Sequence, residues 1–150
     1  MASTKLKSST AELLGKLYKN AQMGREALLG LLPKVNDVSF KSDLTLQLNG
    51  YEQLTEKINH LLQLAHEPSE NDSLMQKVGA KVGCAMNTLL DSSDSHIADM
   101  VLQGSTMGMS DTIKLIREYE NTNASEASLA LAREMVSFEE QNIERLKAYL

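Results

Sequence analysis

The sequence is poor in the residues that cross-link, interrupt or stiffen a chain. Its 150 residues include one cysteine, Cys84, two prolines and no tryptophan, and aromatic residues make up 4%. A single cysteine excludes an internal disulfide. Leucine occurs 24 times, against 11 for valine and isoleucine together, so the local preferences favour helices over strands. We therefore expect an all-α protein and exclude an all-β fold.

Long apolar runs and an excess of positive charge are also missing. No stretch is long and apolar enough to predict a membrane span, and the polar Met1–Thr10 segment lacks the apolar core of a signal peptide. The formal net charge is -5, which argues against binding to nucleic acid or to an anionic membrane. We expect a cytoplasmic protein with a mobile tail over residues 1–10 and a single domain over 11–150.

Apolar residues recur at helical spacing along most of the chain. Long stripes cover residues 10–32, 40–65, about 93–119 and 126–150, and a short stripe covers 74–90. Thr10 is the expected N-cap of the first helix, and Pro33 and Pro68 follow the ends of the first two. Because each long helix has one apolar stripe, the four are expected to form a bundle.

The short helix decides the expected topology of this bundle. If the second and third long helices ran antiparallel, a tight turn could join them. The intervening helix instead indicates that these two helices run parallel and that the connection between them crosses the bundle. The sequence thus predicts a ferritin-like four-helix bundle with a short extra helix before the third long one.

Two helices were tested for the Glu-x-x-His motif that ferritin-like di-metal centres use. The last helix has Glu139 and Asn142 at this spacing, and the second has Glu52 and Thr55, so both histidines are missing. Amide and hydroxyl groups stand in their places. No iron or manganese cofactor is therefore expected.

The other two helices offer few oxygen ligands. Ala21 stands at the centre of the first apolar stripe, and the third stripe contains Gly104 and Gly108, with Asp111 only at its margin. The four helices therefore offer fewer inward-facing oxygen ligands than a di-iron or di-manganese centre uses.

We interpret the inward carboxylate Glu139 as part of a buried polar layer that occupies the position of the lost metal site. A buried carboxylate needs hydrogen-bond donors, and the sequence provides several at comparable depths. The predicted layer consists of Arg25, Tyr51, Glu52, Thr55, Glu139 and Asn142.

A second candidate site lies along the third helix. His96, Met100, Gln103 and Met107 share one stripe and would line a groove, since methionine is an adaptable apolar residue. Glycines four residues apart are typical of close helix crossings, which are predicted at the pairs Gly79 and Gly83, and Gly104 and Gly108.

Four segments carry a resemblance to uncharacterised ferritin-like bundle proteins of anaerobic Gram-positive bacteria. They are residues 17–24 (LYKNAQMG), 86–91 (MNTLLD), 95–100 (SHIADM) together with 103–108 (QGSTMG), and 138–146 (FEEQNIERL). The resemblance covers residues 11–150 and implies a metal-dependent oxidase, peroxidase or storage role. The sequence departs from the superfamily's metal-binding pattern at Ala21, Thr55 and Asn142.

Three functions follow, in order of preference. The first is a non-catalytic bundle that acts by binding a protein partner or a second copy of itself as a homodimer. The second is a divergent iron or manganese oxidoreductase that uses Glu52, Asp111, Glu139 and Asn142. The third is a small-molecule carrier with a pocket beside His96 and Met107. No phosphate-binding loop or nucleophile with a partner base is present, so no hydrolase or transferase is predicted.

Overall fold

The computed structural model describes residues 8–68 and 91–150, and these two ranges are helical without strands. The long helices are α1 (Ser9–Leu31), α2 (Val38–Leu64), α4 (Asp94–Tyr119) and α5 (Glu126–Leu146), and the short 3-10 helices are η1 (Leu32–Lys34) and η2 (Lys147–Tyr149). The predicted all-α class is confirmed for these ranges. The predicted short helix over 74–90 lies outside them, as do Gly79 and Gly83.

Each long helix begins at a side chain that caps its first turn. Ser8, Asp37, Ser93 and Ser125 accept a hydrogen bond from the backbone N–H three residues later. The prediction of Thr10 as the first N-cap was wrong, because the Ser8 side chain accepts from the N–H of Ala11 at 3.1 Å. Ser9 and Thr10, which were predicted to belong to the N-terminal tail, lie in α1 instead, and the rest of that prediction falls on residues 1–7, outside the described ranges.

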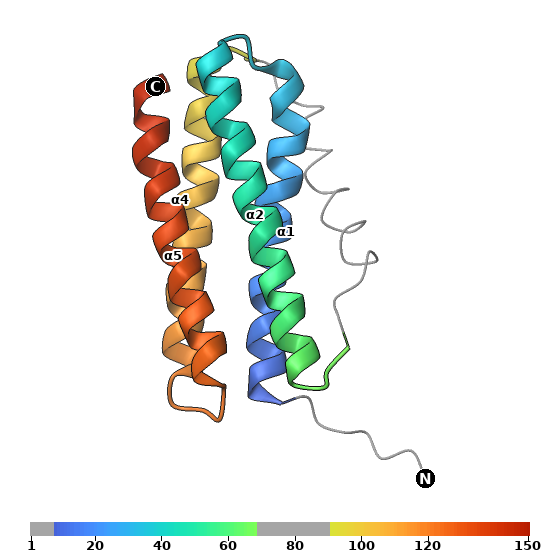
Figure 1. The fold of residues 1–150 in the computed structure, drawn as a ribbon. Coiled ribbons are helices and arrows are strands. Elements are labelled where there is room, and N and C mark those ends of the chain that lie inside the picture. The colour runs from blue at the N-terminus through green and yellow to red at the C-terminus, as the bar shows by residue number, and fades with distance from the viewer. Residues whose placement is uncertain (1–7, 69–90) are drawn as a thin grey trace.

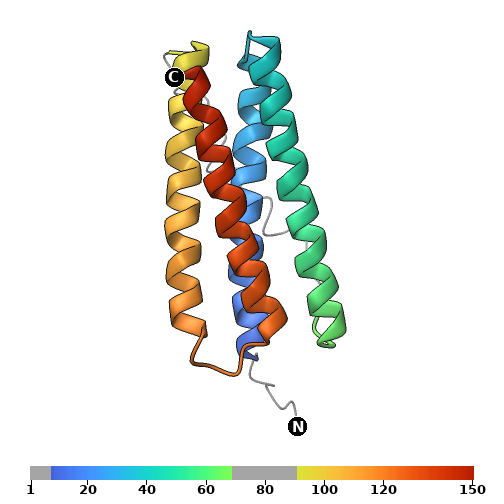
Figure 2. The ribbon, with the colours of Figure 1, turned by 60° about the vertical axis from the view of Figure 1, so that its left-hand side comes forward.

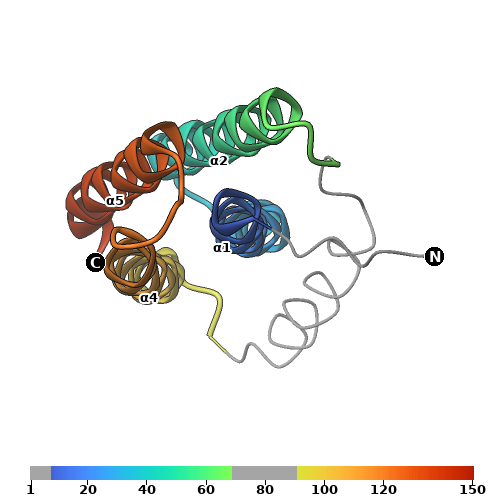
Figure 3. The ribbon, with the colours of Figure 1, turned by 90° about the horizontal axis from the view of Figure 1, so that it is seen from below.

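The four helices form a bundle in which neighbours run antiparallel. α1 and α5 run in one direction, and α2 and α4 run in the other (Figures 1 and 2). Helix α1 packs mainly against α2, and α4 packs mainly against α5, with further contacts between α1 and α4 and between α2 and α5 (Figure 3). The parallel course of α2 and α4 agrees with the predicted crossover. Helix α2 ends and helix α4 begins at opposite ends of the bundle (Figure 1).

Leucine and other aliphatic side chains fill the core. Leu13, Leu17, Phe40, Ile58 and Ile97 are among its largest fully buried residues. Burying an aliphatic side chain of this size contributes about 1.5–3 kcal/mol of transfer free energy. No helix in the described ranges has the length and apolar character that a membrane crossing needs.

The inward face of α4 differs from the predicted one. Gly104 was assigned to the buried stripe, but it is exposed, and the neighbouring Ser105 is buried instead. Thr112 is buried as well and donates its hydroxyl hydrogen to the carbonyl oxygen of Gly108 at 2.8 Å. Small hydroxyl side chains can face a core when their hydrogen bonds are satisfied. A prediction based on apolar residues alone misses such positions.

Hydrogen bonds tie the loops to neighbouring helices at both ends of the bundle. The carboxylate of Asp94 accepts from the backbone N–H groups of Asn36 and Asp37, at 2.9 and 2.7 Å. At the other end, the hydroxyl oxygen of Thr10 accepts from the N–H of Ser125 at 2.8 Å. These bonds anchor the two ends of the bundle where α1 and α4 meet, and the site described next lies between these two helices.

Candidate ligand-binding cavity

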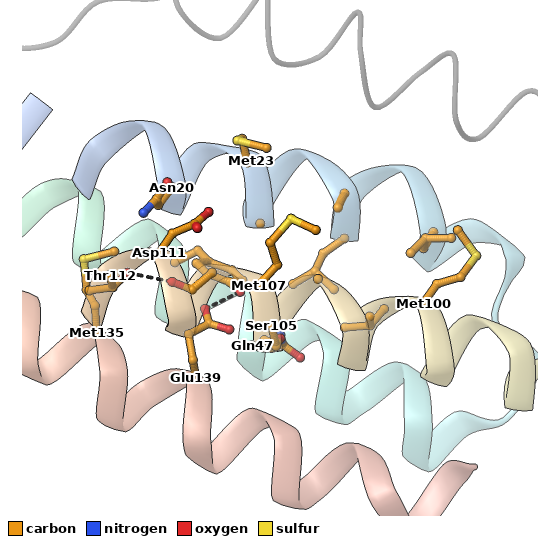
Figure 4. A pocket seen from close by; sticks show the side chains of 18 residues that line it. Asn20, Met23, Gln47, Met100, Ser105, Met107, Asp111, Thr112, Met135 and Glu139 are labelled. Atoms are coloured by element: carbon orange, nitrogen blue, oxygen red, sulfur yellow. Dashed lines mark hydrogen bonds between the residues drawn. The ribbon is translucent and has the colours of Figure 1, made fainter. Parts of the chain in front are cut away.

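A cavity of about 250 Å³ lies between α1 and α4, above side chains from α2 and α5 (Figure 4). Most of its lining is apolar. The lining residues are Asn20, Met23, Gly24, Ala27, Leu28, Leu31, Gln47, Tyr51, Met100, Val101, Gly104, Ser105, Met107, Gly108, Asp111, Thr112, Met135 and Glu139.

The cavity has one polar end and one apolar end. Asn20, Asp111 and Glu139 lie together toward the first, beside Met135, and Met100 lies at the second (Figure 4). From Met100 to Asp111 helix α4 advances about 16 Å. The cavity is therefore elongated along the bundle axis and amphipathic from end to end.

Glu139 is the most constrained side chain of the polar end. It is 5% exposed, and its Oε1 atom accepts a hydrogen bond of 2.5 Å from the Tyr51 hydroxyl. Its Oε2 atom is buried and has no hydrogen-bond partner among the described residues. Burial raises the pKa of Glu139 from its ordinary 4.5 to about 7, although hydrogen bonds from Tyr51 and Ser105 partly oppose this shift.

The ring of Tyr51 is fixed by close packing on two sides. A β-carbon placed on Gly24 would lie 2.4 Å from the Tyr51 Cζ atom, so only glycine leaves room for the ring at this point. On α5, the Phe138 ring packs edge to face against it, with 5.0 Å between the centroids. The burial and the nearby Glu139 carboxylate raise the pKa of Tyr51 well above its ordinary range, which keeps the hydroxyl a donor.

The open space of the cavity arises where α4 has glycines in place of side chains. A β-carbon on Gly104 would meet no atom within 4 Å, and one on Gly108 would meet the Glu139 Cδ atom at 3.9 Å. A helix crossing at this pair was predicted, but no backbone of the described residues approaches these positions closely. The predicted crossing is therefore not formed with any helix of the described ranges.

The predicted polar layer is present only in part. Glu139 and Asn142 are buried on α5, and Tyr51 bonds to Glu139 as proposed. The Thr55 hydroxyl, by contrast, donates to the backbone carbonyl of Glu52 in its own helix at 2.7 Å. The Nδ2 atom of Asn142 has no partner among the described residues.

Arg25 was expected to reach Glu139 and does not do so in the structure. Its guanidinium donates to Glu26 at 3.0 Å and to Glu52 at 3.4 Å, on the outer side of the α1 and α2 pair. A partly exposed guanidinium keeps more of its hydration there than it would in the core, where only one carboxylate is available.

The predicted groove of α4 divides in two. Met100 and Met107 line the cavity, and Met107 is 63% exposed at its rim. His96 and Gln103 do not line it. The backbone N–H of His96 bonds to the capping Ser93 side chain, and the Gln103 amide donates to Asp99 at 3.0 Å on the helix surface.

The proposed metal ligands are not brought together. Glu139 and Asp111 line the cavity, but Glu52 pairs with Arg25, and Asn142 is not part of the lining. Across residues 8–68 and 91–150, no three histidine, cysteine or carboxylate side chains are grouped as a metal ion would require. The chemistry that this arrangement supports is the binding of an elongated amphipathic molecule.

Several residues of the cavity were not singled out by the sequence analysis. Gln47 and Ser105 are both buried and joined by a hydrogen bond of 3.1 Å, which closes the floor beside Tyr51. Met23, 42% exposed, forms the α1 side of the rim, and Gly24 admits the Tyr51 ring.

Comparisons of the chain with protein-family models, curated proteins and solved structures found no match. The geometry of the cavity is thus the basis for inferring a function.

Proposed function

We propose that this protein binds a small amphipathic molecule in the cavity between α1 and α4. The observation that carries the proposal is Glu139, a buried carboxyl group with one oxygen unpartnered, at the polar end of an otherwise apolar cavity. A buried polar atom without a partner costs about 1–3 kcal/mol. A ligand that donates a hydrogen bond to this atom would recover that free energy.

The size and lining of the cavity support this proposal. An apolar cavity of about 150 Å³ accommodates benzene, so about 250 Å³ suits a slightly larger molecule with a slender apolar part. Small-molecule sites are typically apolar with a few fixed polar groups, and here Tyr51 fixes Glu139 while Asn20 and Asp111 stand at the same end. This was the third of the functions inferred from the sequence, and the cavity moves it to first place.

A ferritin-like bundle without its metal centre is the second part of the proposal. The parallel course of α2 and α4 supports this layout. The relation to bacterial ferritin-like proteins, a protein partner or homodimer, and a cytoplasmic location stay predictions.

Methionine methyl groups offer a direct test of the cavity as a binding site. Of the eight methionines, Met23, Met100, Met107 and Met135 line the cavity, whereas Met109 on α4 does not. We expect titration with n-hexanol or n-hexylamine to shift the ¹³C-methyl NMR signals of the four lining methionines and to leave Met109 nearly unchanged.

The control is a pair of leucine substitutions on α4. Gly104→Leu would place a side chain in the open space of the cavity and should abolish the shifts, whereas Gln103→Leu adds the same side chain on the exposed surface and should not. The proposed function is wrong if neither compound moves the four signals, or if Gly104→Leu binds as the unmodified chain does.

A further inference from the structure

Among the described residues, the ionisable groups that line the cavity are acidic. From α4 and α5 come Asp111 and Glu139, and from α2 comes the Tyr51 phenol, while the lining residues of α1 are uncharged. No lysine, arginine or histidine of the described residues lines it. Two basic residues are adjacent in sequence to lining residues of α1. Lys19, next to Asn20, is exposed and does not line the cavity, and Arg25, next to Gly24, is bonded to Glu26 and Glu52.

We propose that the ligand is a primary alkylamine in its protonated form, an inference that rests on the small-molecule function above. Its ammonium group donates a hydrogen bond to the Oε2 atom of Glu139, with Asp111 nearby at the mouth and Asn20 beside it. Its alkyl chain extends toward Met100 and Leu31 at the apolar end.

Charge distinguishes this class from the other amphipathic molecules of the same shape. A fatty acid would bring a third negative charge to the end that holds two carboxyl groups. An alcohol would satisfy Oε2 but leave the carboxylate without a counter-charge. An ammonium ion does both, and a hydrogen bond between charged groups is about twice as strong as one between neutral groups.

Tyr51 makes the carboxylate suitable for a cation. The Tyr51 hydroxyl donates a hydrogen bond to Oε1 of Glu139. The other carboxylate oxygen, Oε2, has no partner among the described residues and can accept a hydrogen bond, and a ligand with several N–H donors can supply one. Thr112, which also lines this region, donates its hydroxyl hydrogen to the Gly108 carbonyl. The Ser105 hydroxyl oxygen accepts from the Gln47 amide, and a side-chain hydrogen bond from Ser105 also favours the charged form of Glu139.

The affinity for the amine should then depend on the pH of the solution. Alkylamines have pKa values near that of lysine, about 10.4, so the ligand stays protonated over the range in which Glu139, with a pKa of about 7, loses its charge. Tyr51 stays protonated and donates throughout this range, so the predicted change in affinity is assigned to Glu139. Affinity for the amine should fall about tenfold for each pH unit below 7.

The test is isothermal titration calorimetry with three probes of equal chain length, namely n-hexylamine, n-hexanol and n-hexanoate, at pH 8 and pH 5. At pH 8 we expect hexylamine to bind about tenfold more tightly than hexanol or better, and hexanoate most weakly. Glu139→Gln should remove the advantage of the amine and its pH dependence while it changes hexanol affinity little. Glu140→Gln, an exposed carboxylate one residue further along α5, is the charge-matched control and should change neither.

The outcomes separate the two proposals. Equal binding of hexylamine and hexanol, or tighter binding of hexanoate, would overturn the assignment of the amine and leave the cavity as a binding site. An amine affinity that rises at pH 5, or that survives Glu139→Gln unchanged, would overturn it as well. Binding of none of the three probes would overturn the small-molecule function and this inference with it.

Discussion

Glu139 brings a titratable group into the bundle, where Tyr51 donates to one of its oxygens. Because its pKa rises from 4.5 to about 7, the folded chain binds more protons than the unfolded chain between these values. The stability contributed by this proton is fully present below pH 4.5 and is lost as the pH rises through about 7. The shift corresponds to about 3 kcal/mol in favour of the folded state at low pH.

Replacing Glu139 by glutamine should remove this dependence. At pH 8 we expect Glu139→Gln to raise the free energy of unfolding by about 1–3 kcal/mol, because a neutral amide replaces a buried charge. At pH 5 the variant and the unmodified chain should differ by less than about 1 kcal/mol. Urea denaturation at the two pH values measures both, with Glu140→Gln as the control. An equal effect at pH 5 and pH 8 would mean that Glu139 does not titrate in this range.

At the scale of the helices, Gly24 on α1 and Gly104 on α4 have opposite packing environments. Gly24 on α1 makes room for the Tyr51 ring, which would lie 2.4 Å from a β-carbon, whereas Gly104 on α4 borders open space. Both positions are helical, so an alanine at either would improve the helix preference by the same amount. The packing around them is what differs.

The same substitution at these two sites should therefore have opposite effects. Gly104→Ala should raise the free energy of unfolding by about 0.5–1 kcal/mol. Gly24→Ala should lower it by about 1–3 kcal/mol, because Phe138 and Glu139 hold the Tyr51 ring in place and it cannot move aside freely. Chemical denaturation at one pH measures both variants. If both were stabilised, the contact between Gly24 and Tyr51 would not constrain the fold.

The positions of the helices could be predicted because leucine-rich stripes and capping residues are local signals. Glu139 could also be recognised as inward, since it shares a stripe with Met135 and Leu146 on α5. The choice of Tyr51 over Arg25 and Thr55 as its partner could not, because it depends on the ring fitting over Gly24. The cavity could not be predicted either, because a pair of glycines such as Gly104 and Gly108 is equally typical of a close helix crossing.

At the scale of the whole molecule, the chain forms two helical hairpins, α1 with α2 and α4 with α5, which meet along α1 and α4 and along α2 and α5. Contacts within each hairpin join residues close in sequence, whereas contacts between the hairpins join distant ones. Closing the longer loops carries the larger entropic penalty, so the hairpins should form before they dock.

The cavity lies at this junction, and its position has a kinetic consequence. Because its walls come from different hairpins, a bound molecule would bridge parts of the chain that separate early in unfolding. Hexylamine at saturation should then slow the unfolding rate, measured by stopped-flow in urea, and leave the refolding rate nearly unchanged. The ligand would join the two hairpins only late in folding. The time for which it stays bound would determine how often the hairpins separate.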